Sequence, residues 1–409
     1  MKDNNLIFKN NFQPIEKKIT SIKKSYEFSK LLSLLKNEIQ NKEKTINVLN
    51  KNYQFNFKFS QLQKFKKFRK IAIIGMGGSI LGAEAIHDIF KGKIKKDVQF
   101  FNDIDEKKII RFKKKENLTK ILFIIISKSG NTIETLSNFF SLGIIKKNPK
   151  NIIIISEKKD NYLFSLSKKL NLFYIEHNKN IGGRYSVLSE TGIVPSFLMG
   201  LNTNKLRSNL LIFFKKMNIK YLRESSIIIS KLLDSKKYSN LIMLNYSPEL
   251  EKFLYWCQQL LAESLGKKNK GFLPVISNVP KDHHSLLQLY LDGPKDKIFY
   301  IFSIDQKFNI RINTNKHHHK KNIINNKFLS SVKKAQKKAL IKTLIKEKIP
   351  FREFRLKKID ETVLGQLFSY FIIETICVGK LSKINPFNQP AVELVKNFTQ
   401  QFLNQKNQK

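Results

Sequence analysis

Short, mainly apolar runs alternate with helical patterns through the first half of the chain, and this alternation constrains the fold more than any other feature. The runs lie at residues 71–74, 98–101, 121–126, 152–155 and 172–175. Each has the length of a strand, and the segments between them space their apolar residues as helices do. Apolar strands separated by helices are typical of a parallel sheet that is covered on both faces. We therefore predict a doubly wound α/β domain over residues 56–202.

The same pattern recurs less regularly farther along the chain. Helical patterns alternate with strand-like runs at residues 241–244, 272–276, 298–304 and 351–354. We predict a fold of two doubly wound α-β-α sandwich domains with mainly parallel sheets, the second over residues 203–355. Residues 1–55 are polar with helical stretches and predict an N-terminal helical arm. Residues 356–409 predict a C-terminal helical segment, interrupted at Pro386 and Pro390 because proline cannot continue a helix.

The formal net charge of +44 raises the question of a nucleic-acid partner. Lysine, asparagine, isoleucine and phenylalanine are all abundant, and these residues share A/T-rich codons. Arginine, which nucleic-acid-binding proteins favour for its planar donor fork, is scarce. The lysines are also spread through every segment. We therefore favour compositional drift over binding to nucleic acid, and expect the positive potential to attract small anions.

Other sequence features favour a cytoplasmic protein without a metal. No apolar run approaches the roughly 20 residues of a membrane span, and the N-terminus lacks the apolar stretch of a signal peptide. Cys257 and Cys377 lie inside helical patterns, which favours reduced thiols over a disulfide. The tract His317–His319 is open to metal binding, but an exposed loop is the interpretation we favour. We expect no membrane partner, no metal and no organic cofactor.

A glycine loop follows the first predicted strand, in the sequence IAIIGMGGSILG. A dinucleotide-binding loop needs glycine where this loop has Ile80, and a triphosphate-binding loop needs a lysine that is absent here. What remains is a glycine turn with a hydroxyl, Ser79, before a helix. The hydroxyl either caps the helix or helps to bind a phosphate, and this loop alone supports both interpretations.

A second loop favours the interpretation that Ser79 helps to bind a phosphate. SKSGNTIET, residues 127–135, follows the third predicted strand and places several hydroxyls and Lys128 before another helix. Both loops lie at the carboxyl ends of strands in one sheet, where open α/β sheets bind their ligands. Two such loops suit a compact phosphomonoester, whereas a dinucleotide needs a longer groove.

Several segments together resemble one family. SKSGNTIET resembles the phosphate loop of sugar isomerase domains. IGGRYSVLSETGIVP at 181–195 and INPFNQPAVELVK at 384–396 resemble signatures of the phosphoglucose isomerase family, and the length resembles its short bacterial branch. QQLLAESLGK at 258–267 and HHSLLQLYLDGP at 283–294 are similar to two further family segments. These matches follow the family order from about residue 71 to residue 396.

The resemblance implies an aldose–ketose isomerase of glycolysis and gluconeogenesis that needs no cofactor. It interconverts glucose 6-phosphate and fructose 6-phosphate through a cis-enediol intermediate. The resemblance also implies a set of residues that bind the substrate, mainly at its phosphate group: Gly78, Ser79, Ser127, Lys128, Ser129, Thr132 and Gln389. A non-catalytic sugar-phosphate sensor built from the same domains, and a dual phosphoglucose and phosphomannose isomerase, are the alternatives.

The resemblance further implies four catalytic residues. Glu263 is the base that moves the proton, Arg184 stabilises the enediolate oxygen, and His284 and Lys396 open the sugar ring. It places His284 in the active site of a partner subunit, which makes the protein a homodimer. The sequence departs from the family pattern in the C-terminal motif, where the family has Asp, Gly and Gly and this chain has Asn388, Ala391 and Val395.

Overall fold

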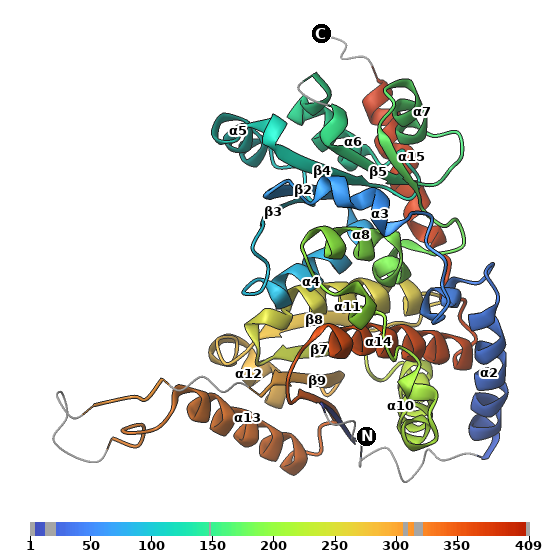
Figure 1. Cartoon of the computed structure of the whole chain (residues 1–409). Coiled ribbons are helices and arrows are strands. Elements are labelled where there is room, and N and C mark those ends of the chain that lie inside the picture. Colours follow the sequence, from blue (N-terminus) through green and yellow to red (C-terminus); the bar gives the residue numbers. More distant parts are fainter. Residues whose placement is uncertain (1–4, 13–21, 147–148, 306–309, 315–321, 406–409) are drawn as a thin grey trace.

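The computed structural model describes residues 5–12, 22–146, 149–305, 310–314 and 322–405. Two five-stranded sheets are stacked in the molecule, with helices outside and between them (Figure 1). This arrangement confirms the predicted pair of α/β sandwich domains. The division of the chain at residues 202 and 355 stays a prediction.

The first sheet is entirely parallel and has the strand order β3-β2-β4-β5-β6. Its strands are β2 (Lys70–Gly75), β3 (Asp97–Phe101), β4 (Ile121–Ile126), β5 (Ile152–Ser156) and β6 (Phe173–Glu176). From β2 the chain adds β3 on one side of that strand. It then crosses back and adds β4, β5 and β6 in turn on the other side. The topological switch point therefore lies between β2 and β4, the two strands that precede the hydroxyl-rich loops.

The second sheet repeats this winding, with the order β1-β10-β9-β7-β8. Its parallel strands are β7 (Asn240–Asn245), β8 (Leu273–Asn278), β9 (Lys297–Ile304) and β10 (Phe351–Leu356). Its switch point lies between β7 and β9. The fifth strand, β1 (Leu6–Asn11), pairs antiparallel with β10. The expected N-terminal helical arm is wrong at this point, because these residues form a strand, and Leu6, Phe8 and Phe12 are buried in the core between the two sheets.

The helices form three layers around the two sheets (Figure 1). The outer face of the first sheet is covered by α5 (Glu106–Lys115), α6 (Ile133–Leu142) and α7 (Tyr162–Lys169). The outer face of the second is covered by α12 (His283–Asp292) and α13 (Leu329–Lys346). One continuous core between the sheets contains α4 (Leu81–Phe90), α8 (Glu190–Leu198), α10 (Lys216–Ser235), α11 (Glu251–Leu265) and α14 (Glu361–Leu381).

Four further helices complete the described chain. They are α2 (Ile22–Gln40), which packs on α10 and α14, the short α3 (Phe59–Leu62) and α9 (Thr203–Leu206), and the C-terminal α15 (Glu393–Asn404). The expectation that no apolar run approaches the length of a membrane span is wrong for α14, which is long and apolar enough by length and composition to cross a membrane. However, 94% of its apolar window is buried inside the protein. In this fold it is the central core helix.

A buried ion pair joins α14 to the second sheet. Arg352 on β10 is fully buried and donates two hydrogen bonds to Glu374 on α14, both at 2.8 Å. The remaining donors of the guanidinium reach Tyr300, Tyr221 and Tyr370, and its Nε donates to Asn10 on β1 at 3.0 Å. One side chain on β10 therefore links that strand to β1, β9, α10 and α14.

The Glu374→Leu variant tests this link. It leaves the charge of Arg352 buried without a counter-ion, and we expect the free energy of unfolding to fall by about 3–5 kcal/mol in urea titrations. The double variant Arg352→Met/Glu374→Leu removes both charges and should regain most of that loss. In the control Lys220→Ala, which breaks an exposed pair with Glu224, the change should stay within about 1 kcal/mol. A Glu374→Leu protein of unchanged stability contradicts the assignment.

Candidate active site

The glycine loop after β2 forms a 3-10 turn, Gly77–Ser79, that packs directly on another backbone segment. A Cβ on Gly78 would lie 2.2 Å from the carbonyl carbon of Gly183, so only glycine permits this approach. Helix α4 has Ile80 at its N-cap and no side-chain cap. The alternative that Ser79 serves as the cap of this helix is therefore wrong, and its hydroxyl is left at the cavity described below.

The loop after β4 gathers its hydroxyls around Thr132. The Thr132 hydroxyl lies 2.9 Å from that of Ser127 and 3.3 Å from that of Ser129. Thr132 occupies the N-cap of α6 without making a capping hydrogen bond, so its hydroxyl stays in this cluster. Gly130 has a φ of +71°, and a Cβ there would overlap Asn161 at 1.8 Å. Glycine is therefore required at the turn that positions the hydroxyls of this loop.

A cavity of about 390 Å³ lies beside both loops and the C-terminal segment. Nine of its lining residues were predicted from the sequence: Gly78, Ser79, Lys128, Ser129, Thr132, Arg184, Glu263, Gln389 and Lys396. Ser127 is buried behind Thr132 and is not part of the lining. Sequence reasoning missed the remaining lining residues, which are Met76, Gly77, Glu157, Lys159, Gly183 and Gln259.

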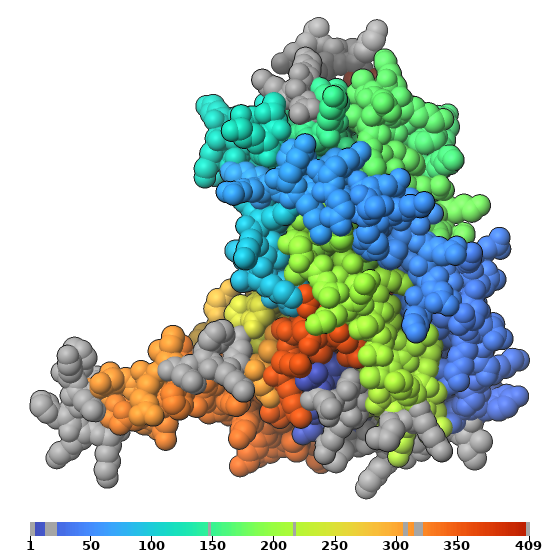
Figure 2. All heavy atoms as spheres, in the orientation of Figure 1, coloured from blue at the N-terminus to red at the C-terminus, as the bar shows by residue number. Residues whose placement is uncertain are grey.

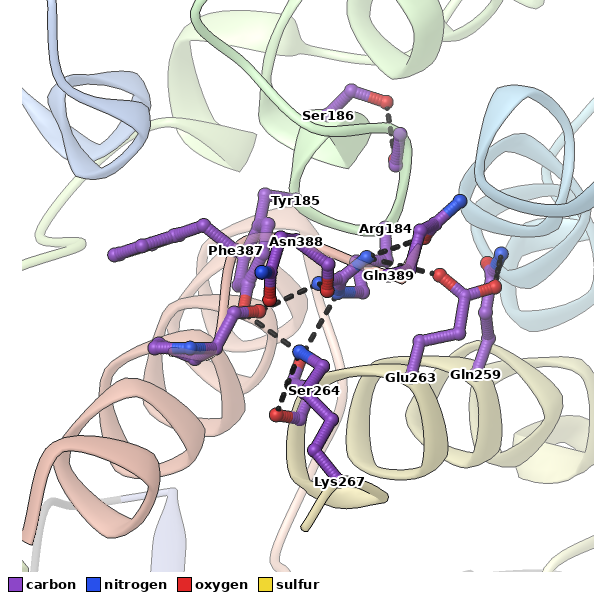
Figure 3. Close-up of polar contacts among 12 residues, drawn as sticks. Arg184, Tyr185, Ser186, Gln259, Glu263, Ser264, Lys267, Phe387, Asn388 and Gln389 are labelled. Carbon is purple, nitrogen blue, oxygen red and sulfur yellow. Dashed lines mark hydrogen bonds and ion pairs between the residues drawn. The ribbon is translucent and has the colours of Figure 1, made fainter. Parts of the chain in front are cut away.

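Arg184 is the most highly connected side chain of the site (Figure 3). It lies in the 3-10 segment Gly183–Leu188 and is 2% exposed. Its Nε donates to the Ser264 hydroxyl at 2.8 Å, and its Nη2 donates to the carbonyl oxygens of Pro386 and Asn388 at 2.6 and 3.1 Å. Its Nη1 donates to Gln389 at 2.7 Å and, at 3.0 Å, to a carboxylate on α11. All five N–H donors of the guanidinium are therefore engaged.

That carboxylate belongs to Glu263, which lies in the last turn of α11 (Figure 3). The helix ends at Leu265 and has Gly266 at its C-cap. One carboxylate oxygen accepts from Arg184 at 3.0 Å, and the other accepts from Gln259 at 2.8 Å. Gln259 lies one helical turn earlier on the same face, and this i, i+4 spacing is the sequence signal that could have identified it. Two donors thus fix the orientation of a carboxylate that is 30% exposed to the cavity.

Cations outnumber carboxylates in the wall of the cavity. Glu157, which follows β5, pairs with Lys159 at 2.6 Å and with Lys128 at 3.5 Å. Burial lowers the pKa of Lys128, and the nearby carboxylate of Glu157 opposes that shift. Lys396 lies on α15 and pairs with Glu393 at 2.7 Å. Together with Arg184 these lysines give the site a positive potential suited to an anionic ligand.

His284 does not line this cavity. It is exposed in the first turn of α12, on the outer layer of the second domain (Figure 1). Among the residues that the structure describes, no group of three or more His, Cys, Asp or Glu side chains is arranged to hold a metal ion. The tract His317–His319 lies outside the described residues.

Known proteins resemble this chain over most of its length. A protein-family model described as phosphoglucose isomerase matches residues 47–409. A probable glucose-6-phosphate isomerase from Methanococcus maripaludis is 33% identical, covering 85% of this chain and 81% of the relative. A glucose-6-phosphate isomerase from Campylobacter jejuni is 30% identical over 84% of this chain and 87% of the relative.

Solved structures show the same fold. A hypothetical protein from Thermus thermophilus aligns with a TM-score of 0.78 at 21% identity, covering 98% of this chain and all of the other. A glucose-6-phosphate isomerase from Chlamydia trachomatis aligns with a TM-score of 0.67 at 18% identity, covering 84% and 71%. The chain therefore shares its overall fold with these two proteins.

The match of the family model over most of the chain, together with these relatives, settles the family. The chain belongs to the phosphoglucose isomerase family.

The close approach of Gly78 to Gly183 can be tested by Gly78→Ala. The added methyl overlaps backbone rather than a flexible side chain, so we expect thermal or urea denaturation to show a loss of about 1–3 kcal/mol. The matched control is Gly92→Ala, where a Cβ meets nothing within 4 Å. The control should stay within about 0.5 kcal/mol of the native protein. Equal stability of the two variants contradicts the described contact between the loops.

Proposed function

We propose that the protein interconverts glucose 6-phosphate and fructose 6-phosphate as an aldose–ketose isomerase. The observation that carries the proposal is the pairing of Glu263 with Arg184 beside a cavity that two hydroxyl-rich loops also line. A hexose phosphate needs both features, because its phosphate must be held while a proton moves at the other end of the molecule. The family membership of the chain supports the same reaction.

The phosphate group is bound by the loops after β2 and β4. Ser79, Ser129 and Thr132 present hydroxyls to the cavity, and Lys128 adds positive charge. Ser127 acts through Thr132, whose hydroxyl it holds at 2.9 Å. Backbone N–H groups at the start of α6 add further donors, since the N-terminus of a helix favours an anion. Gln389 approaches the same cavity from the C-terminal segment.

Glu263 is the base that transfers the proton. It removes the proton from carbon 2 of the open-chain aldose and returns it to carbon 1, so that a cis-enediol lies between the two sugars. Arg184 stabilises the charge that develops on the enediolate oxygen, because a guanidinium stays protonated throughout. Since all five donors of Arg184 are engaged, the substrate oxygen has to replace either Gln389 or Glu263 at Nη1.

Ring opening needs a proton donor and acceptor near the ring oxygen. Lys396 lines the cavity and supplies one such group. His284 supplies the other from a second copy of the chain, because within its own chain it lies outside the cavity lining. The active protein is therefore a homodimer in which each site is completed by the partner's His284.

The remaining expectations follow from this role. A glycolytic enzyme that acts on hexose phosphates works in the cytoplasm and needs neither a membrane nor a nucleic-acid partner. The net charge of +44 then reflects composition, with attraction of the anionic substrate as its consequence.

The direct test is a coupled assay that starts from fructose 6-phosphate and detects glucose 6-phosphate. In this assay Glu263→Gln should lower kcat by about 10²–10⁴-fold, the usual contribution of a general base, with little change in KM. The control Glu251→Gln changes a carboxylate on the same helix outside the cavity and should keep native turnover. Near-native turnover of Glu263→Gln shows that another residue is the base. A native protein that binds fructose 6-phosphate without turnover is a sensor and not an isomerase.

Subunit complementation tests the place of His284. Glu263→Gln and His284→Ala should each be nearly inactive alone. Mixed in equal amounts and allowed to exchange subunits, they should recover about one quarter of native activity, because half of the dimers then contain one intact site. An inactive mixture, with exchange verified by a size or charge tag, shows that His284 acts within its own chain. A His284→Ala protein that is fully active alone shows that His284 takes no part in the reaction.

A further inference from the structure

The second sheet has a topological switch point of its own, which the candidate active site does not use. In the first sheet the cavity lies beside the loops that follow β2 and β4, the strands on either side of its switch point. The corresponding strands of the second sheet are β7 and β9. Ligands of open α/β sheets bind outside the carboxyl ends of strands at such a point.

A separate cavity of about 210 Å³ lies there. Tyr246 directly follows β7, Ser303 and Ile304 end β9, and the N-terminal half of α13 supplies the facing wall. None of these residues lines the candidate active site. Figure 1 shows α13 at the end of the molecule away from the first domain, so the two cavities belong to different regions.

Three lysines of α13 line this second cavity. Lys333 and Lys337 are one turn apart, and Lys334 is adjacent to Lys333. Lys337 is only 12% exposed and is held by Glu353 at 2.8 Å and by the buried hydroxyl of Ser303 at 2.9 Å. Within the described part of the chain, neither Lys333 nor Lys334 makes an ion pair.

The carboxylate of Asp305 lies in the same wall but does not neutralise Lys333 and Lys334. Asp305 follows β9 and is held by Arg355, which donates to both of its oxygens at 2.7–3.0 Å. The positive charge of Lys333 and Lys334 is therefore available to an anion. Lysine is a common ligand for phosphate groups in proteins.

The rest of the wall is apolar. Ile304 lies beside the strand end, and Ile310 and Leu329 lie near one another, since Leu329 N–H donates to the Ile310 carbonyl oxygen at 2.9 Å. Ile310 is 65% exposed and Leu329 is 54% exposed. A ligand that covers large exposed apolar side chains beside a cavity binds favourably, because it removes their apolar surface from water.

We propose that this cavity binds a small organic phosphate whose carbon skeleton is apolar. The phosphate group contacts Lys333 and Lys334, and the carbon skeleton packs on Ile304, Ile310 and Leu329. Hexose phosphates are disfavoured here because their hydroxyls would face apolar side chains without partners. The site is independent of the proposed isomerase reaction.

Calorimetric titration of the full-length protein with phenyl phosphate tests the proposal. Excess fructose 6-phosphate is present throughout, so that the first cavity is occupied. We expect one phenyl phosphate to bind per chain, and inorganic phosphate to bind more weakly because it lacks the apolar group. Lys333→Ala/Lys334→Ala should weaken binding by about tenfold or more, since two charge-assisted contacts are lost. Its turnover without phenyl phosphate should stay native.

The matched control is Lys338→Ala/Lys342→Ala, which removes the same charge from the same helix outside the cavity. This variant should bind as the native protein does. Equal weakening in both double variants means that the ligand is attracted by the net charge of +44 and not by a site. Absence of phenyl phosphate binding in the presence of fructose 6-phosphate, or tighter binding of inorganic phosphate, also overturns the proposal.

Discussion

The site depends on one guanidinium that holds three parts of the chain together. Arg184 belongs to the first domain, and its partners Glu263 and Ser264 lie on α11 after β7. Its other partners lie in residues 384–389, between α14 and α15, a segment that we call the connector. An arginine can do this because its five donors point in fixed directions within one plane. With the side chain 2% exposed, these hydrogen bonds are shielded from water, which makes them costly to break.

The backbone around the Arg184 guanidinium is packed so that this side chain reaches its partners. Gly78 permits the loop after β2 to lie against Gly183, which fixes the segment carrying Arg184. The connector places Gln389 at the cavity, and α15, which follows it, places Lys396 there. The two hydroxyl-rich loops belong to one sheet and the proposed base follows a strand of the other. The function that we propose therefore puts the reacting end of the sugar phosphate where the two domains meet.

Local patterns predicted the fold and much of the site. Apolar runs identified β2 to β6, and glycine with hydroxyls identified both loops, because strands and turns depend on nearby residues. The sequence did not predict β1, whose single short strand becomes stable only by pairing with β10, about 340 residues away. It also missed Glu157, Lys159 and Met76, since their place in the cavity depends on how distant elements pack. The family resemblance, rather than any local pattern, identified Arg184 and Glu263.

Hydrogen–deuterium exchange on Arg184→Lys tests the central claim most directly. Lysine keeps the charge but cannot make five planar hydrogen bonds, so the connector loses its attachment to the first domain. The account predicts faster amide exchange at residues 384–389 than in the native protein, with the exchange of β2 and β4 unchanged. Equal exchange in the connector of both proteins contradicts the claim that Arg184 assembles the site.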